Sequence, residues 1–403
     1  MSGYVPGGGP ADRPRPAEPD FESASLADIA AGAGLRRVHL IAWRDLDDPE
    51  AGGSELHAAE VASRWAQAGL DVSMRTSSFE PRSSMKVRDG YAVIRKSGRY
   101  LVFPRTALSS GIGRTGPWDG LVEIWNGMPF FSPLWARCPS IVFLHHVHAE
   151  MWKMVLPPAL ARVGDAIEAR IAPRFYRRTP IVTLSESSKA EITEMLRLPA
   201  GNITVVPPGI GPGFSPAGPK SERPLVVAVG RLVPVKRFHL LIEALVRVRE
   251  SVPDLEAVIV GEGYERAELE ARIEQAEAGG WLSLPGRVSD AELVSLYRRA
   301  WLVASSSARE GWGMTITEAA ACGTPAVATD IAGHRDAVED GTSGLLVDGP
   351  RGLAEGMTRV LLDPTTRHKL SEGAVRVASR FTWDATARGT LSVLAAEARR
   401  RRA

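Results

Sequence analysis

The chain has 403 residues, 44% of them hydrophobic, and a net charge of +2 at neutral pH. This length exceeds what one hydrophobic core usually holds, so we expect two globular domains, and the balance of charges gives no reason to expect a nucleic-acid partner. Two cysteines cannot form a metal site alone, no apolar run has the length of a membrane span, and the first residues lack the pattern of a secretion signal. We therefore expect a cytoplasmic protein.

The N-terminal part alternates predicted strands and helices. Residues 1–34 are rich in Pro, Gly and charge, which predicts a disordered tail, and 35–206 are expected to form the first domain. The apolar run 37–43 predicts a strand, and a helix is expected over 55–68, ended by Gly69. Further strands are predicted at 71–75, 91–95, 121–125, 141–144 and 181–184.

The loop at 45–54, between the first strand and the first helix, holds two features. Gly52 and Gly53 precede the helix, where a backbone without side chains can either form a simple turn or approach an anion at the helix start. Asp45 and Asp47 have the spacing of a metal-binding pair, but such pairs in loops are frequent by chance. We expect no bound metal.

Three histidines, His145, His146 and His148, follow the predicted strand at 141–144, at the end of a sheet where α/β proteins bind ligands. Neighbouring residues of an extended chain point to opposite sides, and the only nearby acidic residue is Glu150, so a metal site is the weaker interpretation. His146 is interpreted as a residue that caps the strand edge.

The segment 151–178 combines apolar residues at helical spacing with basic residues. An apolar stripe of this kind most often belongs to a core, which is the favoured interpretation, and contact with an anionic lipid surface is the alternative. The apolar positions are Trp152, Leu156, Leu160, Val163, Ile167, Ile171 and Phe175, and the basic ones are Lys153, Arg162, Arg170, Arg174, Arg177 and Arg178.

Prolines and glycines concentrate at 205–216 and cannot continue a helix or a central strand, so an interdomain linker is expected at 207–224. The second domain is expected over 225–380. A last helix is expected over 381–403, ending in a basic tail that is expected to fray.

The second domain opens with a predicted strand at 225–229, which is followed by Arg231 and Lys236. Two cations five positions apart at the end of a first strand are poorly explained by a solvated face. They indicate an anionic ligand at the carboxyl edge of the sheet. Further strands are predicted at 255–260, 281–284 and 345–347.

The densest motif lies between 301 and 325. Residues 301–304 predict a buried strand, and a helix is expected over 315–322 after a loop with Gly311 and Gly313. Unpaired backbone N–H groups at the start of a helix can hold a phosphate or diphosphate.

Two glutamates flank this phosphate-binding turn. Glu310 lies on the loop and Glu318 lies about one turn inside the helix. Carboxylates repel phosphate and accept hydrogen bonds, so their natural partners are the hydroxyl groups of a sugar or a ribose. An anion site alone would not explain this pair.

With these residues the chain resembles the retaining glycosyltransferases of family 4. The resemblance covers about 37–395, and the glycine loop, the two cations and the two glutamates agree with the family in order and spacing. It implies an α/β fold of two doubly wound Rossmann-like domains that face each other across a cleft, the GT-B fold. It also implies that the last helix crosses back to the first domain.

The resemblance assigns a role to each candidate residue. Glu310 would contact the donor sugar and Glu318 the nucleotide ribose. His148, and next to it His145, would contact the transferred sugar or the acceptor. The donor diphosphate and base would be bound by Gly52, Gly53, Arg231, Lys236, the amides of Gly313, Met314 and Thr315, and the backbone of Arg287 and Val288.

The chain departs from the family at three positions. Pro208 and Gly211 stand where the family has Asn and Asp in the interdomain crossing, which leaves open any acceptor or hinge contact made by those side chains. Arg237 replaces the usual glycine after Lys236 and adds a third cation.

The reaction implied by the resemblance is transfer of a sugar from a nucleoside diphosphate sugar to an acceptor hydroxyl, with retention of anomeric configuration and no cofactor or metal. Two alternatives are a sugar-nucleotide epimerase or phosphorylase of the same fold and a non-catalytic sugar-nucleotide-binding protein. The sequence does not select the donor base, the sugar, the acceptor, the linkage or the oligomeric state. An inner-membrane surface remains the alternative partner of 151–178.

Overall fold

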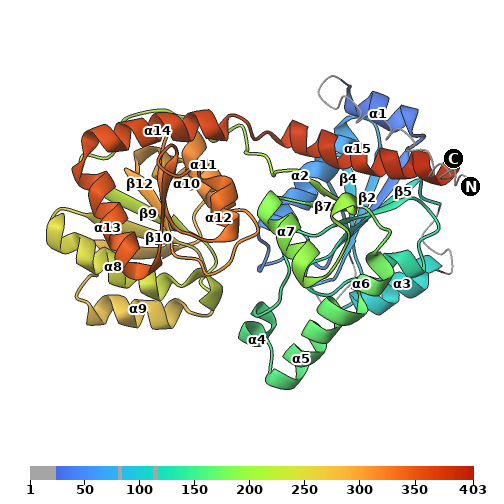
Figure 1. The fold of residues 1–403 in the computed structure, drawn as a ribbon, viewed down its shortest axis with the longest axis horizontal. Helices are drawn as coiled ribbons and strands as arrows, with labels where there is room; N and C mark the ends of the chain where they lie inside the picture. The colour runs from blue at the N-terminus through green and yellow to red at the C-terminus, as the bar shows by residue number, and fades with distance from the viewer. Residues whose placement is uncertain (1–23, 80–83, 112–116) are drawn as a thin grey trace, which may run out of the picture.

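The computed structural model describes residues 24–79, 84–111 and 117–403. They form two α/β halves, each built on one twisted sheet, and the two halves lie side by side (Figure 1). The carboxyl ends of strands from both sheets point toward the place where the halves meet, as the contacts described below show. None of the described helices is long and apolar enough to cross a bilayer.

The N-terminal sheet has eight strands in the order β3-β4-β2-β1-β5-β6-β7-β8. All neighbours pair in parallel except β3 and β4, which form an antiparallel hairpin at one edge. The strands are β1 Arg37–Ile41, β2 Asp71–Thr76, β3 Ser84–Arg88, β4 Tyr91–Arg95, β5 Gly120–Ile124, β6 Ser140–Phe143, β7 Ile181–Thr183 and β8 Ile203–Val205.

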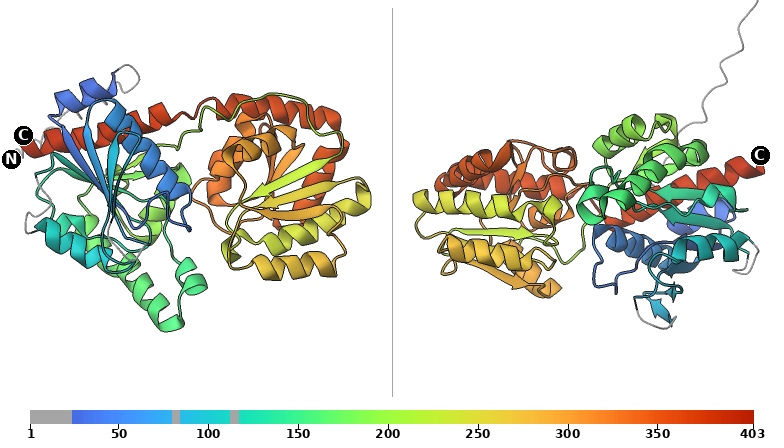
Figure 2. Two further views of the ribbon diagram at one scale, coloured as in Figure 1. Left: turned by 180° about the vertical axis from the view of Figure 1, so that it is seen from behind. Right: turned by 90° about the horizontal axis from the view of Figure 1, so that it is seen from below.

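The helices of this half cover both faces of the sheet and form one projection (Figures 1 and 2). They are α1 Leu26–Gly32, α2 Gly53–Gln67, α3 Val102–Gly111, η1 Ser132–Leu134, α4 Met151–Val155, α5 Pro158–Ala166, η2 Ile167–Ile171, α6 Pro173–Tyr176, α7 Glu186–Met195 and η3 Ala200–Asn202. The η2 stretch is a π-helix, and η1 and η3 are 3-10 helices.

The C-terminal sheet is parallel throughout, with the order β11-β10-β9-β12-β13-β14. The order reverses direction between β9 and β12, which is the position where doubly wound sheets bind ligands. The strands are β9 Leu225–Val229, β10 Glu256–Val260, β11 Leu282–Gly286, β12 Leu302–Ser305, β13 Ala326–Thr329 and β14 Gly344–Val347. The helices are η4 Pro234–Lys236, α8 Phe238–Ser251, α9 Arg266–Gln275, α10 Asp290–Arg299, α11 Met314–Ala321, α12 Ala332–Ala337, α13 Gly349–Leu362, α14 Pro364–Ala378 and α15 Trp383–Arg402.

Helix α15 crosses from the C-terminal half to the N-terminal half, as Figure 1 shows. Trp65 Nε1 on α2 donates to the carbonyl of Ala387 at 2.9 Å, and Leu391 and Leu394 are fully buried in the N-terminal core. Helix α15 therefore packs on the core of the N-terminal half. This helix links the two halves, because the chain passes through it and its side chains pack on the N-terminal half.

The expected fraying at the end of this helix is wrong. Helix α15 continues to Arg402, because Arg400 and Arg401 both pair with the buried carboxylate of Glu397. Arg401 also donates to the carbonyl of Cys138 at 2.6 Å. The basic residues anchor the helix end on the N-terminal half.

The prediction of a disordered tail over 1–34 is wrong for its last part. Helix α1 begins after Ser25, whose Oγ accepts from the amide of Asp28 at 3.2 Å, and Ala30 is buried in the N-terminal core. A helix of 7 residues, about two turns, is too short to show a clear hydrophobic period in sequence. Residues 1–23 lie outside the described part of the chain.

The favoured core assignment for 151–178 is also wrong for several side chains. Trp152 and Tyr176 are buried, but Leu160 and Val163 are 56% and 54% exposed. Ile171 and Phe175 are exposed as well. Helices α4 and α5 project from the body in Figure 1, so part of the apolar stripe has no protein surface to pack on.

Candidate active site

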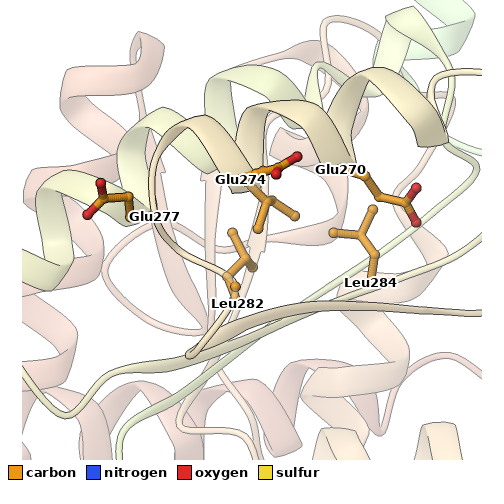
Figure 3. Close-up of a pocket in the computed structure, with 7 residues that line it drawn as sticks. Glu270, Glu274, Glu277, Leu282 and Leu284 are labelled. Carbon is orange, nitrogen blue, oxygen red and sulfur yellow. The ribbon is translucent and has the colours of Figure 1, made fainter.

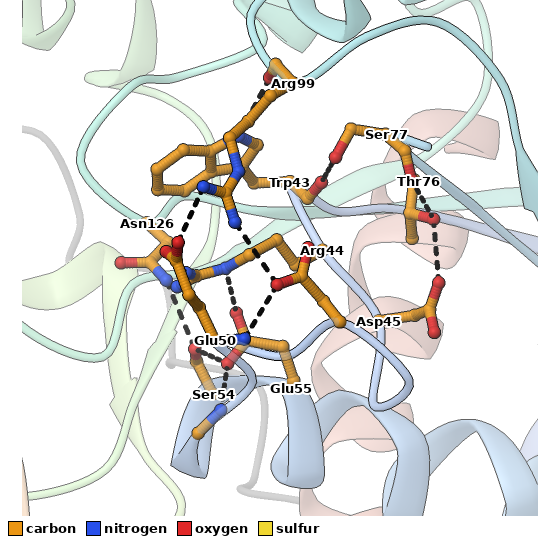
Figure 4. A network of polar contacts seen from close by, with 12 residues as sticks. Trp43, Arg44, Asp45, Glu50, Ser54, Glu55, Thr76, Ser77, Arg99 and Asn126 are labelled. Carbon is orange, nitrogen blue, oxygen red and sulfur yellow. Dashed lines mark hydrogen bonds and ion pairs between the residues drawn. The ribbon is translucent and has the colours of Figure 1, made fainter. Parts of the chain in front are cut away.

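The glycine loop joins β1 to α2 and is held by side chains around it (Figure 4). The amide of Gly52 donates to Glu55 Oε2 at 2.8 Å, and Arg44 Nε donates to Glu55 Oε1 at 3.2 Å. Ser54 Oγ donates to the same carboxylate at 2.9 Å. The buried carboxylate of Glu55 thus fixes the start of α2 and leaves Gly52 and Gly53 at the surface of the loop.

This loop meets two elements of the C-terminal half. A Cβ atom placed on Gly52 would lie 3.8 Å from Nε of Arg231, and one placed on Gly53 would lie 3.0 Å from Sδ of Met314. Four of the predicted residues, distant in sequence, therefore converge at one point. At Gly53 the lack of a side chain allows this close approach, whereas a Cβ on Gly52 would be in ordinary contact with Arg231.

Arg231 and Lys236 follow β9 on a turn that ends in η4. Arg237 takes a left-handed conformation with φ of 50° and begins α8, which explains why a glycine is usual there. Ser306 Oγ donates to the carbonyls of Lys236 and Arg237 at 2.8 and 3.0 Å and holds this turn against the end of β12. The side chain of Arg231 is exposed.

Glu310 lies on the loop after β12 and pairs with Lys236. Ser307 Oγ donates to the same carboxylate at 2.8 Å. Burial would raise the pKa of Glu310, but the charge of Lys236 and the two hydrogen bonds outweigh it, so the pKa lies below its ordinary value. Glu310 is therefore an ionised acceptor beside a cation.

The loop after β12 leads into α11 through Gly313, which has φ of 111° and acts as the helix N-cap. The amides of Met314 and Thr315 belong to the first positions of the helix, where backbone N–H groups have no intrahelical acceptors. These N–H groups form the positive end of the helix dipole, which is a suitable place for a diphosphate to bind.

Glu318 lies one turn further along α11. Its nearest polar partner is the hydroxyl of Tyr297, which donates to Oε2 at 3.4 Å, and no ion pair to Glu318 occurs among the described residues. Burial raises the pKa of Glu318 to about 8. The two glutamates thus differ, because one has a cation beside it and the other does not.

The three histidines separate into two sets, as the alternation of an extended chain predicts. His145 points into the N-terminal half, with Nε2 lying 3.2 Å from Nδ1 of His57. The rings of His146 and His148 stack on the other side, with centroids 4.9 Å apart. Burial lowers the pKa of all three and brings that of His146 to about 4.

Within the described residues, Nε2 of His146 and Nδ1 of His148 are buried without a hydrogen-bond partner. Buried polar atoms of this kind are rare and call for an explanation such as a ligand contact. Each of these two rings therefore has one nitrogen that could pair with a polar ligand, and the roles of His148 and His146 stay predictions.

Arg287 and Val288 follow β11, the edge strand of the C-terminal sheet. The side chain of Arg287 is exposed and donates from Nη2 to the carbonyl of Pro49 at 3.3 Å. Arg287 therefore reaches across to the loop that carries Gly52. The backbone of Arg287 lies at the carboxyl edge of the C-terminal sheet, as the sequence predicts.

Asp45 and Asp47 bind protein cations. Arg95 forms a fork on Asp45, with distances of 2.7 and 2.9 Å, and both Arg95 and Arg88 pair with Asp47. Lys86 Nζ lies 3.1 Å from Asp47. Across 24–79, 84–111 and 117–403, no group of three or more His, Cys, Asp or Glu residues has the geometry to hold a metal.

Sequence reasoning missed several residues that bring the halves together. Arg309 pairs with Glu191 on α7, and the hydroxyls of Ser185 and Ser188 donate to the carbonyl of Gly311 at 3.3 and 3.2 Å. A Cβ on Gly311 would lie 2.7 Å from the carbonyl oxygen of His145. Adjacency to Glu310 was the only sequence signal for these contacts.

His334 is a further missed residue, buried beneath the Glu310 loop. Its Nδ1 donates to the carbonyl of Thr329 at 2.8 Å, so Nε2 can accept from Ser305 Oγ at 3.1 Å. Burial lowers the pKa of His334. It lies on α12, the helix that follows the carboxyl end of β13, and this position is the one signal that could have pointed to it.

A surface hollow of about 450 Å³ lies on the other side of the C-terminal half, between α9 and β11 (Figure 3). Its lining consists of Glu270, Ile273, Glu274, Glu277, Gly279, Leu282 and Leu284. Three carboxylates repel a diphosphate, so this hollow is unsuited to a nucleotide.

Comparison with known proteins places this chain in a family. The profile described as "Glycosyltransferase Family 4" matches residues 51–213, and the profile "Glycosyl transferases group 1" matches residues 214–377. The D-inositol 3-phosphate glycosyltransferase of Corynebacterium urealyticum is 33% identical, over 84% of this chain and 89% of the relative. The chain belongs to glycosyltransferase family 4.

Other relatives and solved structures agree with this assignment. The D-inositol 3-phosphate glycosyltransferase of Acidothermus cellulolyticus is 30% identical over 92% of this glycosyltransferase and 94% of the relative. Sucrose-phosphate synthase from Thermosynechococcus elongatus has a TM-score of 0.76 at 19% identity, covering 87% and 96% of the two chains. HepE of Anabaena in complex with UDP-glucose has a TM-score of 0.69 at 18% identity, covering 88% and 98%. These structures share the GT-B fold with the glycosyltransferase.

The glycosyltransferase is a retaining enzyme that moves a sugar from a nucleoside diphosphate sugar to an acceptor hydroxyl. Departure of a nucleoside diphosphate develops negative charge on its oxygens. The arrangement of two cations and a helix start at one point can stabilise that charge without a metal. The carboxylates beside it can orient hydroxyl groups.

Proposed function

We propose that the diphosphate of the donor binds between the Gly52–Gly53 loop, Arg231 and the first turn of α11. The observation that supports this most is the approach of Gly52 to Arg231 and of Gly53 to Met314, because it brings backbone from one half to a cation of the other half and to the first residue of α11. Glu310 would then orient the sugar hydroxyls and Glu318 the ribose. His148 would contact the sugar or the acceptor.

Lys236 has a double role in this proposal. An ammonium group carries three N–H donors, so Lys236 can keep its contact with Glu310 while it donates to the leaving diphosphate. The acceptor hydroxyl would attack from the face that the diphosphate leaves, and a diphosphate oxygen would take its proton. Retention of configuration follows from this geometry.

We propose that no metal or cofactor is needed. Asp45 and Asp47 are already bound by Arg88, Arg95 and Lys86, and protein groups supply the positive charge around the diphosphate. Activity should therefore persist in EDTA within about twofold, since no metal-dependent step is removed. Loss of activity that Mg²⁺ or Mn²⁺ restores would contradict this.

For the acceptor we propose a phosphorylated polyol, either free or as a lipid headgroup. The relatives are named for D-inositol 3-phosphate, and two guanidinium groups lie on the N-terminal side of the cleft, where Arg44 and Arg99 share the carboxylate of Glu50 (Figure 4). Guanidinium groups bind phosphate in a forked geometry. Glu50 is 54% exposed and can move aside for a phosphate.

We further propose that α4, α5 and α6 rest on the inner face of an anionic membrane. Their exposed apolar side chains lie among exposed cations, and from 151 to 178 the exposed charged residues are all basic. This combination fits an anionic lipid surface. The test is sedimentation with vesicles of phosphatidylglycerol and of phosphatidylcholine.

Binding to the anionic vesicles alone is expected, and Phe175→Ser combined with Arg174→Ser should weaken it about tenfold, because each basic residue contributes ~1 kcal/mol at such a surface. Leu362→Ser changes a leucine on α13 that is more exposed than Phe175, at 59% against 40%, and is the control. Equal sedimentation of wild type with both vesicles, or no sedimentation, would contradict the proposal.

The experiment for the whole proposal is a panel of UDP-, GDP- and ADP-glucose and the matching N-acetylglucosamine donors. Each is tested with free D-inositol 3-phosphate and with phosphatidylinositol vesicles, and nucleotide release and product are measured. One donor with one acceptor form should dominate. Product with inverted configuration, or a sugar change without an acceptor, would overturn the assignment.

A further inference from the structure

The loop that carries His148 is fastened by one buried carboxylate, that of Glu168. Glu168 is 1% exposed. Its Oε1 accepts from the amide of His148 at 2.9 Å, and its Oε2 accepts from the amide of Ala149 at 3.1 Å and from Nε1 of Trp152 at 2.9 Å. All three neighbours are donors, an arrangement that favours the ionised carboxylate, while burial raises the pKa of Glu168 above its ordinary value.

The position of Glu168 depends on an irregular helix. The π-helical stretch η2 lies between α5 and α6, where Pro173 follows. Proline lacks an N–H group and its ring crowds the carbonyl four residues earlier, which widens the turn before it. Single π turns are found often at functional sites. Here the wider turn directs Glu168 inward, toward the end of β6.

The anchored segment determines where the ring of His148 lies. Ala149 has φ of 44°, a left-handed conformation that a non-glycine residue holds only when its surroundings impose it. The ring of His148 packs beside Trp152, with centroids 5.2 Å apart, and a Cβ on Gly127 would lie 3.0 Å from its Nε2. Glu168 thus holds both the backbone of His148 and the indole that supports its ring.

We infer that Glu168 is a positioning residue for sugar transfer, which acts by holding His148 in the cleft. It does not touch the donor or the acceptor. The inference rests on the proposed role of His148. Neither the motifs nor the spacing in the sequence pointed to Glu168.

The test is a double-mutant cycle with Glu168→Gln and His148→Ala. Glutamine keeps the shape but places an NH₂ group against N–H donors. Turnover of the donor that is fastest in the panel above should fall about tenfold or more in Glu168→Gln, in line with the loss of a charged hydrogen-bond acceptor. The donor KM should stay within about twofold, since the residue is remote from the nucleotide.

The decisive measurement is the same change in the His148→Ala background. If Glu168 acts through His148, Glu168→Gln should lower turnover of His148→Ala by no more than about twofold. A further tenfold loss there would show a general structural role and overturn the inference. Near-normal turnover of His148→Ala itself would instead overturn the proposed role of His148, which separates the two failures.

Two further variants serve this test, one as a substitute for Glu168→Gln and one as a control. Trp152→Phe removes a single donor and should give a smaller loss that is also absent in His148→Ala, so it replaces Glu168→Gln if that variant does not fold. Asp165→Asn changes a neighbouring acidic residue outside this hydrogen-bond set and should leave turnover within about twofold.

The NMR spectrum of histidine-labelled protein tests the inference independently of enzyme activity. The ring signals of His148 and of His146, stacked on it, should shift or broaden in Glu168→Gln, while those of His39 stay in place. Unchanged His148 signals would overturn the inference.

Discussion

Arg231 lies where the glycine loop meets the C-terminal half, and Lys236, five positions later, pairs with Glu310 on the loop after β12. We predict that Lys236→Ala and Arg231→Ala each lower turnover about 100-fold or more, because each removes positive charge from the leaving diphosphate, worth ~3 kcal/mol in the transition state. Steady-state kinetics with the best donor measures this. Arg231 is exposed, so its loss should change the melting temperature little, whereas Lys236→Ala leaves Glu310 without its ion pair and should lower the melting temperature.

Arg237→Gly is the matched control for these variants. It removes a cation next to Lys236 and keeps the left-handed backbone, which glycine adopts without strain. Its turnover should stay within about threefold of wild type. Near-normal turnover in Lys236→Ala or Arg231→Ala would remove the role assigned to that residue.

Glu318 gives a prediction about pH. Its pKa of about 8 lies above its ordinary value, so the carboxyl group is mostly protonated at neutral pH in the empty cleft. Binding a ribose through an ionised carboxylate then requires loss of a proton. Donor affinity should rise with pH between about 6 and 8, by up to about tenfold per unit, and Glu318→Gln should remove this dependence.

Calorimetric titration of the nucleoside diphosphate at several pH values tests this, and Glu310→Gln is the contrast. Glu310 has a lowered pKa and stays ionised in this range, so its variant should keep the pH dependence of affinity and lose turnover. A flat affinity profile in wild type would contradict the assignment of Glu318 to the ribose.

At the scale of elements, the loop after β12 touches the N-terminal half through a glycine. Gly311 has an ordinary backbone conformation, but a Cβ there would lie 2.7 Å from the carbonyl oxygen of His145. Gly311→Ala must therefore push the Glu310 loop away from the histidine strand. We predict a turnover loss of about tenfold or more, since misplacement by ~1 Å is costly in catalysis.

The matched control is Gly213→Ala, which has open space around the added methyl group and should keep full activity. Small-angle scattering should show a more open shape for Gly311→Ala at unchanged melting temperature within a few degrees. Normal turnover together with an unchanged shape would show that this contact is not needed for closure.

Sequence patterns predicted correctly the strands and helices that have a clear apolar run or clear start and stop residues. The strands at 225–229 and 301–304 and the helix at 315–322 agree with β9, β12 and α11 within one or two residues. Helix α1 was missed because its order comes from packing on α15, and the exposure of α5 was missed because amphipathic spacing is the same for a core and for a lipid surface. A local sequence pattern does not reveal what packs against the apolar face of a helix.

At the scale of the whole molecule, the sequence identified the two halves of the cleft and the resemblance placed them together. It did not reveal the contacts that join them. Arg309 with Glu191, and Arg287 with the carbonyl of Pro49, link residues more than one hundred positions apart. Such pairs depend on the relative placement of two sheets, which no spacing along one chain encodes.

The whole molecule also gives a prediction about acid stability. Burial lowers the pKa of six histidines, to about 3 for His39 and His57 and to about 4 for His146. The others are His145, His148 and His334. These groups are neutral in the folded state, while in the unfolded state they take up protons below their ordinary value of 6.5.

The stability that these histidines contribute is therefore fully present above about pH 6.5 and is lost as the pH falls toward their folded pKa values. The loss in the free energy of unfolding is up to ~1.4 kcal/mol per pH unit for each histidine. Glu123, Glu168, Glu265 and Glu318 act in the opposite direction, because their raised pKa values cost stability as the pH rises above about 4.5. Six histidines outweigh four glutamates, so the urea midpoint should fall between pH 6.5 and 5. His57→Gln should reduce that slope by about one proton, and His368→Gln, at a position 77% exposed, should leave it unchanged. A midpoint that is constant or rises on acidification would contradict the burial of neutral histidines beneath the cleft.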